Sequence, residues 1–293
     1  MLSPTPRDFT FNAADGTPLA GTLFEPPETA KGAVLIAGAL GVTKRFHSPF
    51  AQWLTARGYW VMTFDLRGIG ASRQTMHKHS LKGLDADMLT WARLDFSAAV
   101  HRLSELNCGE PITLVGHSLG INHAGMTDAA TQRRVGHAIS VAAGAGFWRD
   151  WAAPSRRVAP LMLHVAVPLL TPLFGYFPGK WLGMVGDLPG PAARQWARWC
   201  RHPDFAWGAE PDKVMPSLLS ARFRIDAISF TDDEAMTQTC TRKLMAAFAN
   251  ARNTLHVIAP TDVGLTAIGH LGAFRRANSA ELWPRIERLI RSV

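Results

Sequence analysis

The stretch "LVGHSLGI", residues 114–121, places Ser118 between two glycines, after an apolar run and before a segment of helical character. Gly116 and Gly120 carry no side chains that would collide if the chain turned sharply from a strand into a helix. A serine on such a turn lies exposed at the end of its strand. We therefore predict a strand, a tight turn and a helix here, with Ser118 as candidate nucleophile. The alternative is a glycine-rich turn without chemistry.

Apolar runs and helical segments alternate along most of the chain. The first two runs, residues 7–16 and 17–26, read as strands joined by a turn at Asp15 and Gly16. Later apolar runs occupy residues 31–40, 59–66, 111–118, 137–144, 224–231 and 253–260, and helical patterns occupy residues 49–57, 83–107, 120–131, 235–249 and 279–291. This alternation predicts an α/β fold with a mostly parallel sheet and helices on both faces.

Residues 145–222 interrupt the alternation. These 78 residues hold six of the ten tryptophans in the chain: Trp148, Trp151, Trp181, Trp196, Trp199 and Trp207. Prolines recur, and we expect them to divide the segment into short pieces that can shift as units. We predict a core formed by residues 1–144 and 223–293, and an inserted lid or cap formed by residues 145–222.

Two parts of this insert have distinct patterns. The run "VAPLMLHVAVPLLTPLFGYF", residues 158–177, is apolar enough to raise a membrane span, but we expect Pro160, Pro168 and Pro172 to interrupt it. No stable membrane insertion is therefore predicted, although an apolar lid resting on a membrane stays open as an alternative. Residues 191–202 read as a short helix with Trp196, Trp199 and Cys200 on one face.

Composition excludes several classes of protein. The chain has 293 residues, 47% of them hydrophobic and 18% charged, which is typical of a globular protein. Its formal net charge is +8, but no block of five basic residues occurs, so we expect no nucleic-acid partner. Three separated cysteines and an N-terminus without an unbroken apolar stretch favour a cytoplasmic protein.

A serine nucleophile needs a base and an orienting acid, and the chain offers both downstream. Asp232 and Asp233 follow one apolar run, and His270 lies in a glycine-flanked loop after the last run. Among other histidines, His47 is a candidate for lining the pocket. His77 and His79 match only half of an H-x-H-x-D-H pattern, so we expect neither a metal nor a cofactor.

Three motifs in this order resemble the α/β-hydrolase superfamily across essentially the whole chain. "GHSLG" is similar to its nucleophile elbow, "FDLRGIGAS" to the D-x-R-G-x-G-x-S after its fourth strand, and "IGHLGAF" to its histidine loop. The set "GALGV", "SFTDDE", "APTDVG" and "WARWCRHP" also resembles a bacterial group of predicted serine hydrolases whose substrates are unassigned. The resemblance implies acyl transfer to Ser118, with His270 as base.

The resemblance also implies the remaining site residues. Aligning "FTDD" with the superfamily's G-x-x-D turn gives the orienting role to Asp233, with Asp232 as the alternative that otherwise caps a helix beginning near Glu234. The oxyanion hole would use the backbone amides of Leu119 and Ala39, with Leu40 as the fallback donor.

The expected activity is that of an esterase or lipase-like serine hydrolase that cleaves a carboxylic ester or thioester with an apolar acyl group. An acyltransferase or an aminopeptidase-like amidase is the alternative on the same fold, and a non-catalytic binding scaffold is a further one. The oligomeric state stays undetermined by the sequence.

Overall fold

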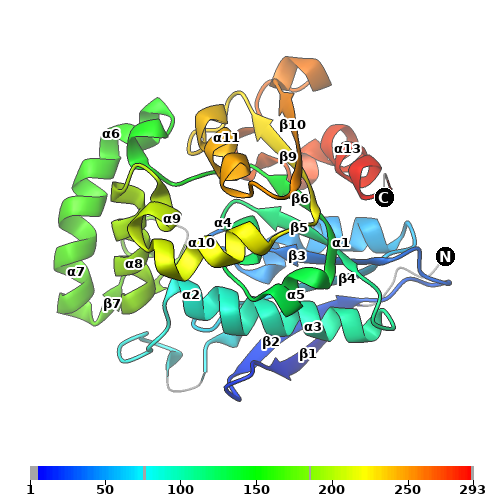
Figure 1. The fold of residues 1–293 in the computed structure, drawn as a ribbon, viewed down its shortest axis with the longest axis horizontal. Coiled ribbons are helices and arrows are strands. Elements are labelled where there is room, and N and C mark those ends of the chain that lie inside the picture. The colour runs from blue at the N-terminus through cyan, green and yellow to red at the C-terminus, as the bar shows by residue number, and fades with distance from the viewer. Residues whose placement is uncertain (1–5, 75–76, 185, 292–293) are drawn as a thin grey trace.

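Eight strands form a single twisted sheet in the order β1-β2-β4-β3-β5-β6-β9-β10 (Figure 1). The computed structural model describes residues 6–74, 77–184 and 186–291. β2 pairs antiparallel with β1 and β4, and from β4 to β10 all neighbours are parallel. The strands are β1 (Arg7–Asn12), β2 (Pro18–Phe24), β3 (Ala33–Ala37), β4 (Trp60–Phe64), β5 (Ile112–His117), β6 (Val135–Val141), β9 (Arg224–Phe230) and β10 (Arg252–Ile258).

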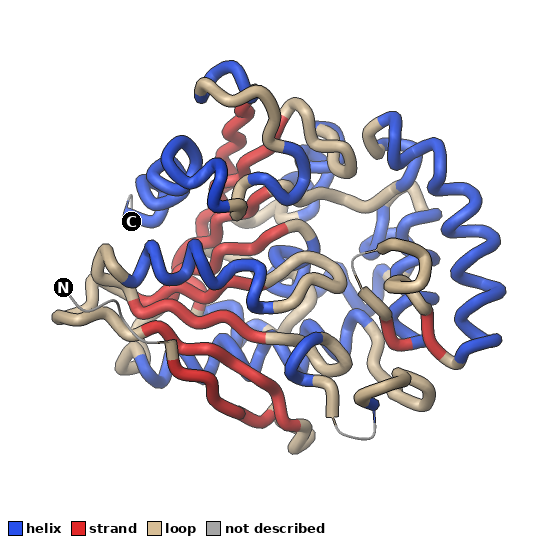
Figure 2. The backbone as a smooth tube through the Cα atoms, turned by 180° about the vertical axis from the view of Figure 1, so that it is seen from behind, coloured by secondary structure: helices blue, strands red, loops and turns tan. Residues whose placement is uncertain are grey.

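Helices cover both faces of this sheet, and a separate apolar core lies under each layer. One core joins the sheet to α1 (Ser48–Thr55) and α13 (Ser279–Arg291), which Figure 2 shows from behind. The other core joins it to the helices of the opposite face, which are α2 (Met88–Thr90), the π-helical turn Trp91–Phe96, α3 (Ser97–Leu106), α4 (Leu119–Ala124) and α11 (Gln238–Ala247). On the same face, α5 (Ala129–Arg133) lies against α3 and β6. The predicted α/β class, a mostly parallel sheet with helices on both faces, is confirmed.

The sequence of the central strands explains this layering. All five residues of β3 are buried, and five of the six residues of β5 are buried as well. A strand that is covered on both faces needs apolar side chains on both, so its apolar run is continuous instead of alternating. The parallel strands then end at one edge of the sheet, where Ser118 follows β5.

Between β6 and β9 the chain leaves the sheet and forms a group of helices and two short strands, which we call the cap. In Figure 1 most of its helices lie to one side of the molecule, and the last one, Pro211–Ser220, leads back toward the sheet. The cap elements are α6 (Ala153–Leu161), a π-helical turn (Met162–Ala166), α7 (Val167–Phe174), β7 (Tyr176–Phe177), β8 (Leu188–Pro189), α8 (Gly190–Arg201), α9 (Phe205–Ala209) and α10 (Pro211–Ser220). Of the three residues predicted on one face of α8, Trp199 and Cys200 are fully buried and Trp196 is partly buried.

The prolines of the cap do not divide it as the sequence indicates. α6, the π-helical turn and α7 run on as one 22-residue helix, Ala153–Phe174. Pro168 lies in the first turn of α7, where the hydrogen-bonding pattern is already changing, so its missing N–H is tolerated. Pro160 and Pro172 lie inside the helix. The expectation that these prolines interrupt the helix is wrong.

A buried carboxylate connects the loops after β3 and β4. Asp65 accepts hydrogen bonds from the backbone amides of Lys44 at 2.6 Å and Ala71 at 2.8 Å. A side chain at Gly70 would lie 2.3 Å from the same carboxylate. The motif "FDLRGIGAS" is therefore a structural one, and it fixes the loop that carries Ala39.

His123 gives the fold a pH-dependent stability. This residue of α4 is buried, and burial lowers the pKa of its imidazole from 6.5 to about 4. Between about pH 6.5 and about pH 4, His123 is protonated in the unfolded chain but neutral in the folded protein. The free energy of unfolding therefore falls as the pH drops through this range. On going from about pH 7 to about pH 5, His123 lowers the free energy of unfolding by about 2 kcal/mol.

In His123→Leu, the loss of stability between about pH 7 and about pH 5 should be about 2 kcal/mol smaller than in wild type. Urea denaturation at several pH values in this range measures the free energy of unfolding. Val100→Ala, a buried truncation in α3 without a titrating group, is the control and should lower stability equally at each pH. An unchanged pH slope in His123→Leu would contradict the assignment.

Candidate active site

Ser118 lies on a strained turn between β5 and α4. Its backbone has φ 52° and ψ −117°, a conformation that side chains rarely adopt. A Cβ at Gly120 would lie 2.2 Å from the carbonyl oxygen of Ala37, and one at Gly116 would lie 2.6 Å from the amide nitrogen of Ile121. The two glycines thus let α4 begin against the ends of β3 and β5, as the sequence predicts.

Three side chains from distant parts of the chain meet at this turn. The Oγ of Ser118 lies 3.0 Å from Nε2 of His270, and Nδ1 of His270 lies 2.9 Å and 3.1 Å from the two carboxylate oxygens of Asp233. The Asp233 side chain is 1% exposed and that of His270 is 15% exposed. The structure therefore brings together the three residues that the sequence singles out.

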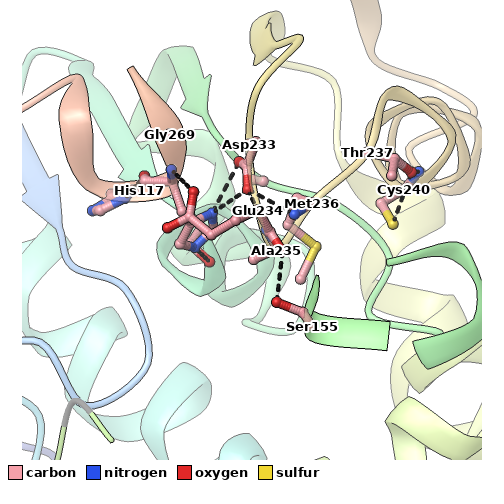
Figure 3. Close-up of polar contacts among 12 residues, drawn as sticks. His117, Ser155, Asp233, Glu234, Ala235, Met236, Thr237, Cys240 and Gly269 are labelled. Carbon is pink, nitrogen blue, oxygen red and sulfur yellow. Dashed lines mark hydrogen bonds and ion pairs between the residues drawn. The ribbon is translucent and has the colours of Figure 1, made fainter. Parts of the chain in front are cut away.

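The hydrogen-bond partners determine the tautomer of His270. A carboxylate can only accept, so Nδ1 carries the proton and donates it to Asp233. Nε2 then has a free lone pair, which can accept the hydroxyl proton of Ser118. Asp233 is held in turn by the backbone amides of Ala235 at 2.7 Å and Met236 at 2.8 Å (Figure 3).

The two acidic neighbours of Asp233 hold the histidine loop by its backbone. Asp232 accepts from the amides of Ile268 at 2.7 Å and Gly269 at 3.1 Å, and Glu234 accepts from the amide of His270 at 2.8 Å. The expectation that Asp232 caps a helix is wrong, because α11 begins only at Gln238 and a different residue caps it. The role of Glu234 is not visible in the sequence, since its partner is a backbone group 36 residues away.

His117 connects the nucleophile turn to the carbonyl of His270. Its Nε2 lies 3.0 Å from that carbonyl oxygen and must donate, so its Nδ1 accepts from Nε2 of His47, also at 3.0 Å. Burial lowers the pKa of His47 to about 3 and holds the pKa of His117 well below its usual range. Both imidazoles are therefore neutral. His47 lies beneath the site and does not line the pocket.

Leu119 and Ala39 carry the backbone amides predicted to form the oxyanion hole. Leu119 is the first residue of α4, so its amide has no partner within the helix. Ala39 follows the end of β3, and Leu40 comes next in the same loop; all three residues line the cavity above Ser118. Within the described part of the chain, the amides of Leu119 and Ala39 donate to no protein acceptor. These two donors fit the predicted oxyanion hole.

The site opens into a cavity of about 560 Å³ between the sheet and the cap. Its walls are mainly aliphatic, aromatic and thioether side chains: Leu40, Val42, Trp151, Val158, Leu161, Met162, Leu182, Met184, Leu188, Trp196, Phe205, Met236 and Leu271. Glu234 is the only carboxylate among the described lining residues. Within residues 6–74, 77–184 and 186–291, no cluster of three potential metal ligands occurs.

The cap is tied to the turn that carries Asp233. Ser155 in α6 donates to the backbone carbonyl of Glu234 at 2.6 Å (Figure 3), and the amide of Ala152 donates to the carbonyl of Ala235 at 3.3 Å. The start of α6 is therefore held against the acid side of the site.

The sequence matches the model of a known enzyme family. The match, to the family described as serine aminopeptidase S33, spans residues 27–256 and so covers most of the chain. The chain belongs to this family. It is therefore an α/β hydrolase, in agreement with the strand order and with the serine at the elbow. A comparison with curated proteins finds no significant match.

Solved structures of other hydrolases share this fold. A thermostable carboxyl esterase from Bacillus coagulans has a TM-score of 0.65 and 14% identity, over 99% of both chains. An esterase from Pyrococcus furiosus has a TM-score of 0.61 and 15% identity, over 99% of this chain and 91% of that one. Dipeptidyl peptidase 4 of Porphyromonas gingivalis has a TM-score of 0.60 and 14% identity, over 100% of this chain and 36% of that one. At these identities the likeness shows the fold alone.

Asp233 and Asp232 should differ sharply in their effect on turnover. Asp233→Asn presents an amide to Nδ1 of His270 and reverses the preferred tautomer, so kcat should fall about 10³ to 10⁴-fold. Asp232→Asn keeps an oxygen that accepts from Ile268 and Gly269, so kcat should stay within about tenfold of wild type. Steady-state kinetics on one activated ester decide the ranking, and the reverse order would transfer the orienting role to Asp232.

His117 should act as a positioning residue. His117→Leu leaves the carbonyl of His270 without its donor, at a cost of about 1–3 kcal/mol, and should lower kcat about 10- to 100-fold with little change in KM. His117→Gln retains an N–H donor and should recover part of the loss. Equal loss in both variants would indicate that only the volume of the ring matters.

Proposed function

We propose that this α/β hydrolase cleaves carboxylic esters or thioesters with an apolar acyl group, through an acyl-enzyme on Ser118. The observation that carries the proposal is the alignment of Ser118, His270 and Asp233 at the floor of an apolar cavity. A nucleophile that is hydrogen-bonded to a base, which is in turn hydrogen-bonded to an orienting acid, is the arrangement required for acyl transfer.

In the acylation step, Nε2 of His270 takes the hydroxyl proton of Ser118 while Oγ attacks the carbonyl carbon of the substrate. The carbonyl oxygen becomes an oxyanion and accepts hydrogen bonds from the amides of Leu119 and Ala39. His270 then gives its proton to the leaving alcohol or thiol, and the bond from the carbonyl carbon to that group breaks. Asp233 stabilises the imidazolium that exists between these two proton transfers.

Deacylation repeats the same steps with water. A water molecule gives one proton to Nε2 of His270 and attacks the acyl carbon, and the oxyanion forms at the same two amides. The tetrahedral intermediate then expels Oγ of Ser118, which recovers its proton from His270. The products are a carboxylic acid and the free enzyme.

The chemistry of the cavity favours an apolar acyl group. Trp151 and Trp196 stack with ring centroids 6.3 Å apart and an angle of 23° between their planes, and both rings line the cavity. Side chains of this kind bind methylene groups by removing them from water, and they offer few partners for a polar substrate. The substrate should therefore be held chiefly by its acyl chain.

A peptidase activity is the second candidate, because the family includes serine aminopeptidases by its description and Glu234 lines the cavity. A carboxylate at that position could accept hydrogen bonds from the N-terminal ammonium group of a peptide. Glu234, however, already accepts from the amide of His270, and no second carboxylate among the described lining residues supports it. Ester cleavage is therefore the better supported reaction.

The proposed reaction is tested by comparing p-nitrophenyl esters with aminoacyl p-nitroanilides. Wild type should hydrolyse the esters and form a covalent adduct with a fluorophosphonate probe, whereas folded Ser118→Ala should form none and lose several orders of magnitude in kcat. Higher kcat/KM on the anilides would favour the peptidase. Turnover of neither class with no labelling would favour a binding scaffold.

The apolar walls should set a preference for acyl length. Each added methylene contributes about 0.8 kcal/mol, so kcat/KM should rise about fourfold per carbon until the cavity is full. Trp196→Ala should widen the cavity and move the optimum toward longer chains.

Trp181→Ala is the matched control for this measurement. Trp181, which the sequence also places in the lid, is 72% exposed and does not line the cavity. The profile for soluble esters should therefore be the same in Trp181→Ala and in wild type. A profile without any dependence on chain length would remove the cap from substrate selection.

A further inference from the structure

The outer side of the cap is an exposed apolar surface. The long helix Ala153–Phe174 lies at the edge of the molecule, with α8 between it and the sheet (Figure 1), and the opposite view agrees (Figure 2). We call its exposed apolar residues, together with two from the following loop, the outer cap face. These residues are between 39% and 75% exposed: Val158, Leu161, Val165, Leu169, Leu173, Phe174, Trp181 and Leu182.

The long helix has a buried side and an exposed apolar side, so it is not a helix buried in a core. Ala159, Leu163, Val167 and Thr171 are buried on its inner side. The exposed apolar residues recur at the three- and four-residue spacing of the opposite side. Only 22% of its most apolar 18-residue window is buried, although its mean hydropathy of 1.5 and its length would suit a membrane span. A helix held along one side by its own protein can lie in a lipid surface but cannot cross the bilayer alone.

The charged residues of the segment that carries the outer cap face, residues 151–186, are all basic. No aspartate or glutamate occurs between Asp150 and Asp187, whereas Arg156, Arg157 and Lys180 do occur there. All three basic residues are exposed, the arginine pair in α6 and the lysine beside Trp181. Phe174 and Trp181 lie with their ring centroids 6.2 Å apart, and aromatic rings of this kind are favoured at the boundary of water and lipid. Cations beside an apolar helix face complement anionic headgroups.

The outer cap face is continuous with the cavity above Ser118. Val158, Leu161 and Leu182 are exposed on the surface and also line the cavity. An acyl chain could therefore pass from a lipid phase to the nucleophile along apolar side chains, without crossing water. A surface for a second copy of this chain would not require such continuity, nor the basic residues at its border.

We propose that the outer cap face docks on an anionic lipid surface, with the helix Ala153–Phe174 lying flat among the headgroups and the cavity mouth facing the lipid. Docking itself stands apart from ester cleavage. The consequence for substrate, which does rest on the proposed function, is that the enzyme acts on esters or thioesters dissolved in or belonging to a membrane.

The docking is tested with full-length Ser118→Ala protein, so that no chemistry alters the lipid. We expect it to sediment with vesicles of phosphatidylcholine and phosphatidylglycerol and to bind much less to vesicles of phosphatidylcholine alone. A triple variant, Val165→Gln, Leu169→Gln and Leu173→Gln, should lower the partition coefficient at least about tenfold. These three residues do not line the cavity, and glutamine retains helix propensity.

Matched controls separate this surface from general effects of polarity and charge. Leu219→Gln and Val257→Gln change side chains that are 41% and 40% exposed outside the outer cap face, and they should leave vesicle binding unchanged. Arg156→Gln with Arg157→Gln should lower binding to the anionic vesicles at least about tenfold. The exposed adjacent pair Arg275→Gln and Arg276→Gln should lower it far less.

Three results would overturn the proposal. The first is no binding to either vesicle. The second is binding that the triple variant leaves unchanged. The third is a dimer in analytical ultracentrifugation that the triple variant dissociates while no vesicle is bound, which would assign the surface to a second copy. Because Ser118→Ala is used throughout, a failure of docking and a failure of the proposed ester cleavage remain distinguishable.

Discussion

The close approach of α4 to the ends of β3 and β5 is the constraint on which the site depends. The chain must reverse within one residue after β5, and Ser118 adopts a φ of 52° to do so. This geometry exists only because Gly116 and Gly120 present no side chain to Ile121 and Ala37. It makes Leu119 the first residue of α4, so the amide of Leu119 has no partner within the helix and stays available for the oxyanion hole that we propose.

The acid turn and the histidine loop form a second rigid unit opposite the serine. Asp232, Asp233 and Glu234 are consecutive, yet each one binds a different part of the loop that carries His270. From the other side, His117 donates to the carbonyl of His270. His270 is held at its backbone amide, its backbone carbonyl and the Nδ1 of its ring. Its imidazole therefore has little freedom to move away from Ser118, which favours proton transfer without reorganisation.

The cap combines two surfaces of the same chemistry. Its inner side contributes Trp151, Trp196 and Met162 to the cavity, and its outer side presents leucines and valines to the surroundings. A soluble protein normally covers a contiguous apolar surface of this kind or uses it for binding. The contact of Ser155 with the turn of Asp233 also connects the start of the cap helix to the acid side of the site. The start of the cap helix and the turn that carries Asp233 are therefore in direct contact.

The sequence by itself determined the elements that depend on neighbours along the chain. The apolar runs at strand spacing predict the sheet, and the glycines around Ser118 predict the elbow, because both are local requirements of backbone geometry. Ser118, Asp233 and His270 each follow an apolar run of strand character, which also predicts that they meet, since parallel strands end at one edge of the sheet.

Only the tertiary structure decided what depends on partners far apart in the sequence. The tasks of Asp232 and Glu234, and the bond from His117 to His270, involve backbone groups of a distant loop, which leave no pattern in the residue types. The continuous helix Ala153–Phe174 was likewise hidden, because packing on one side and a π-helical turn overcome the local penalty of its prolines. Local propensity sets what a segment prefers, and contacts with the rest of the fold decide which preference prevails.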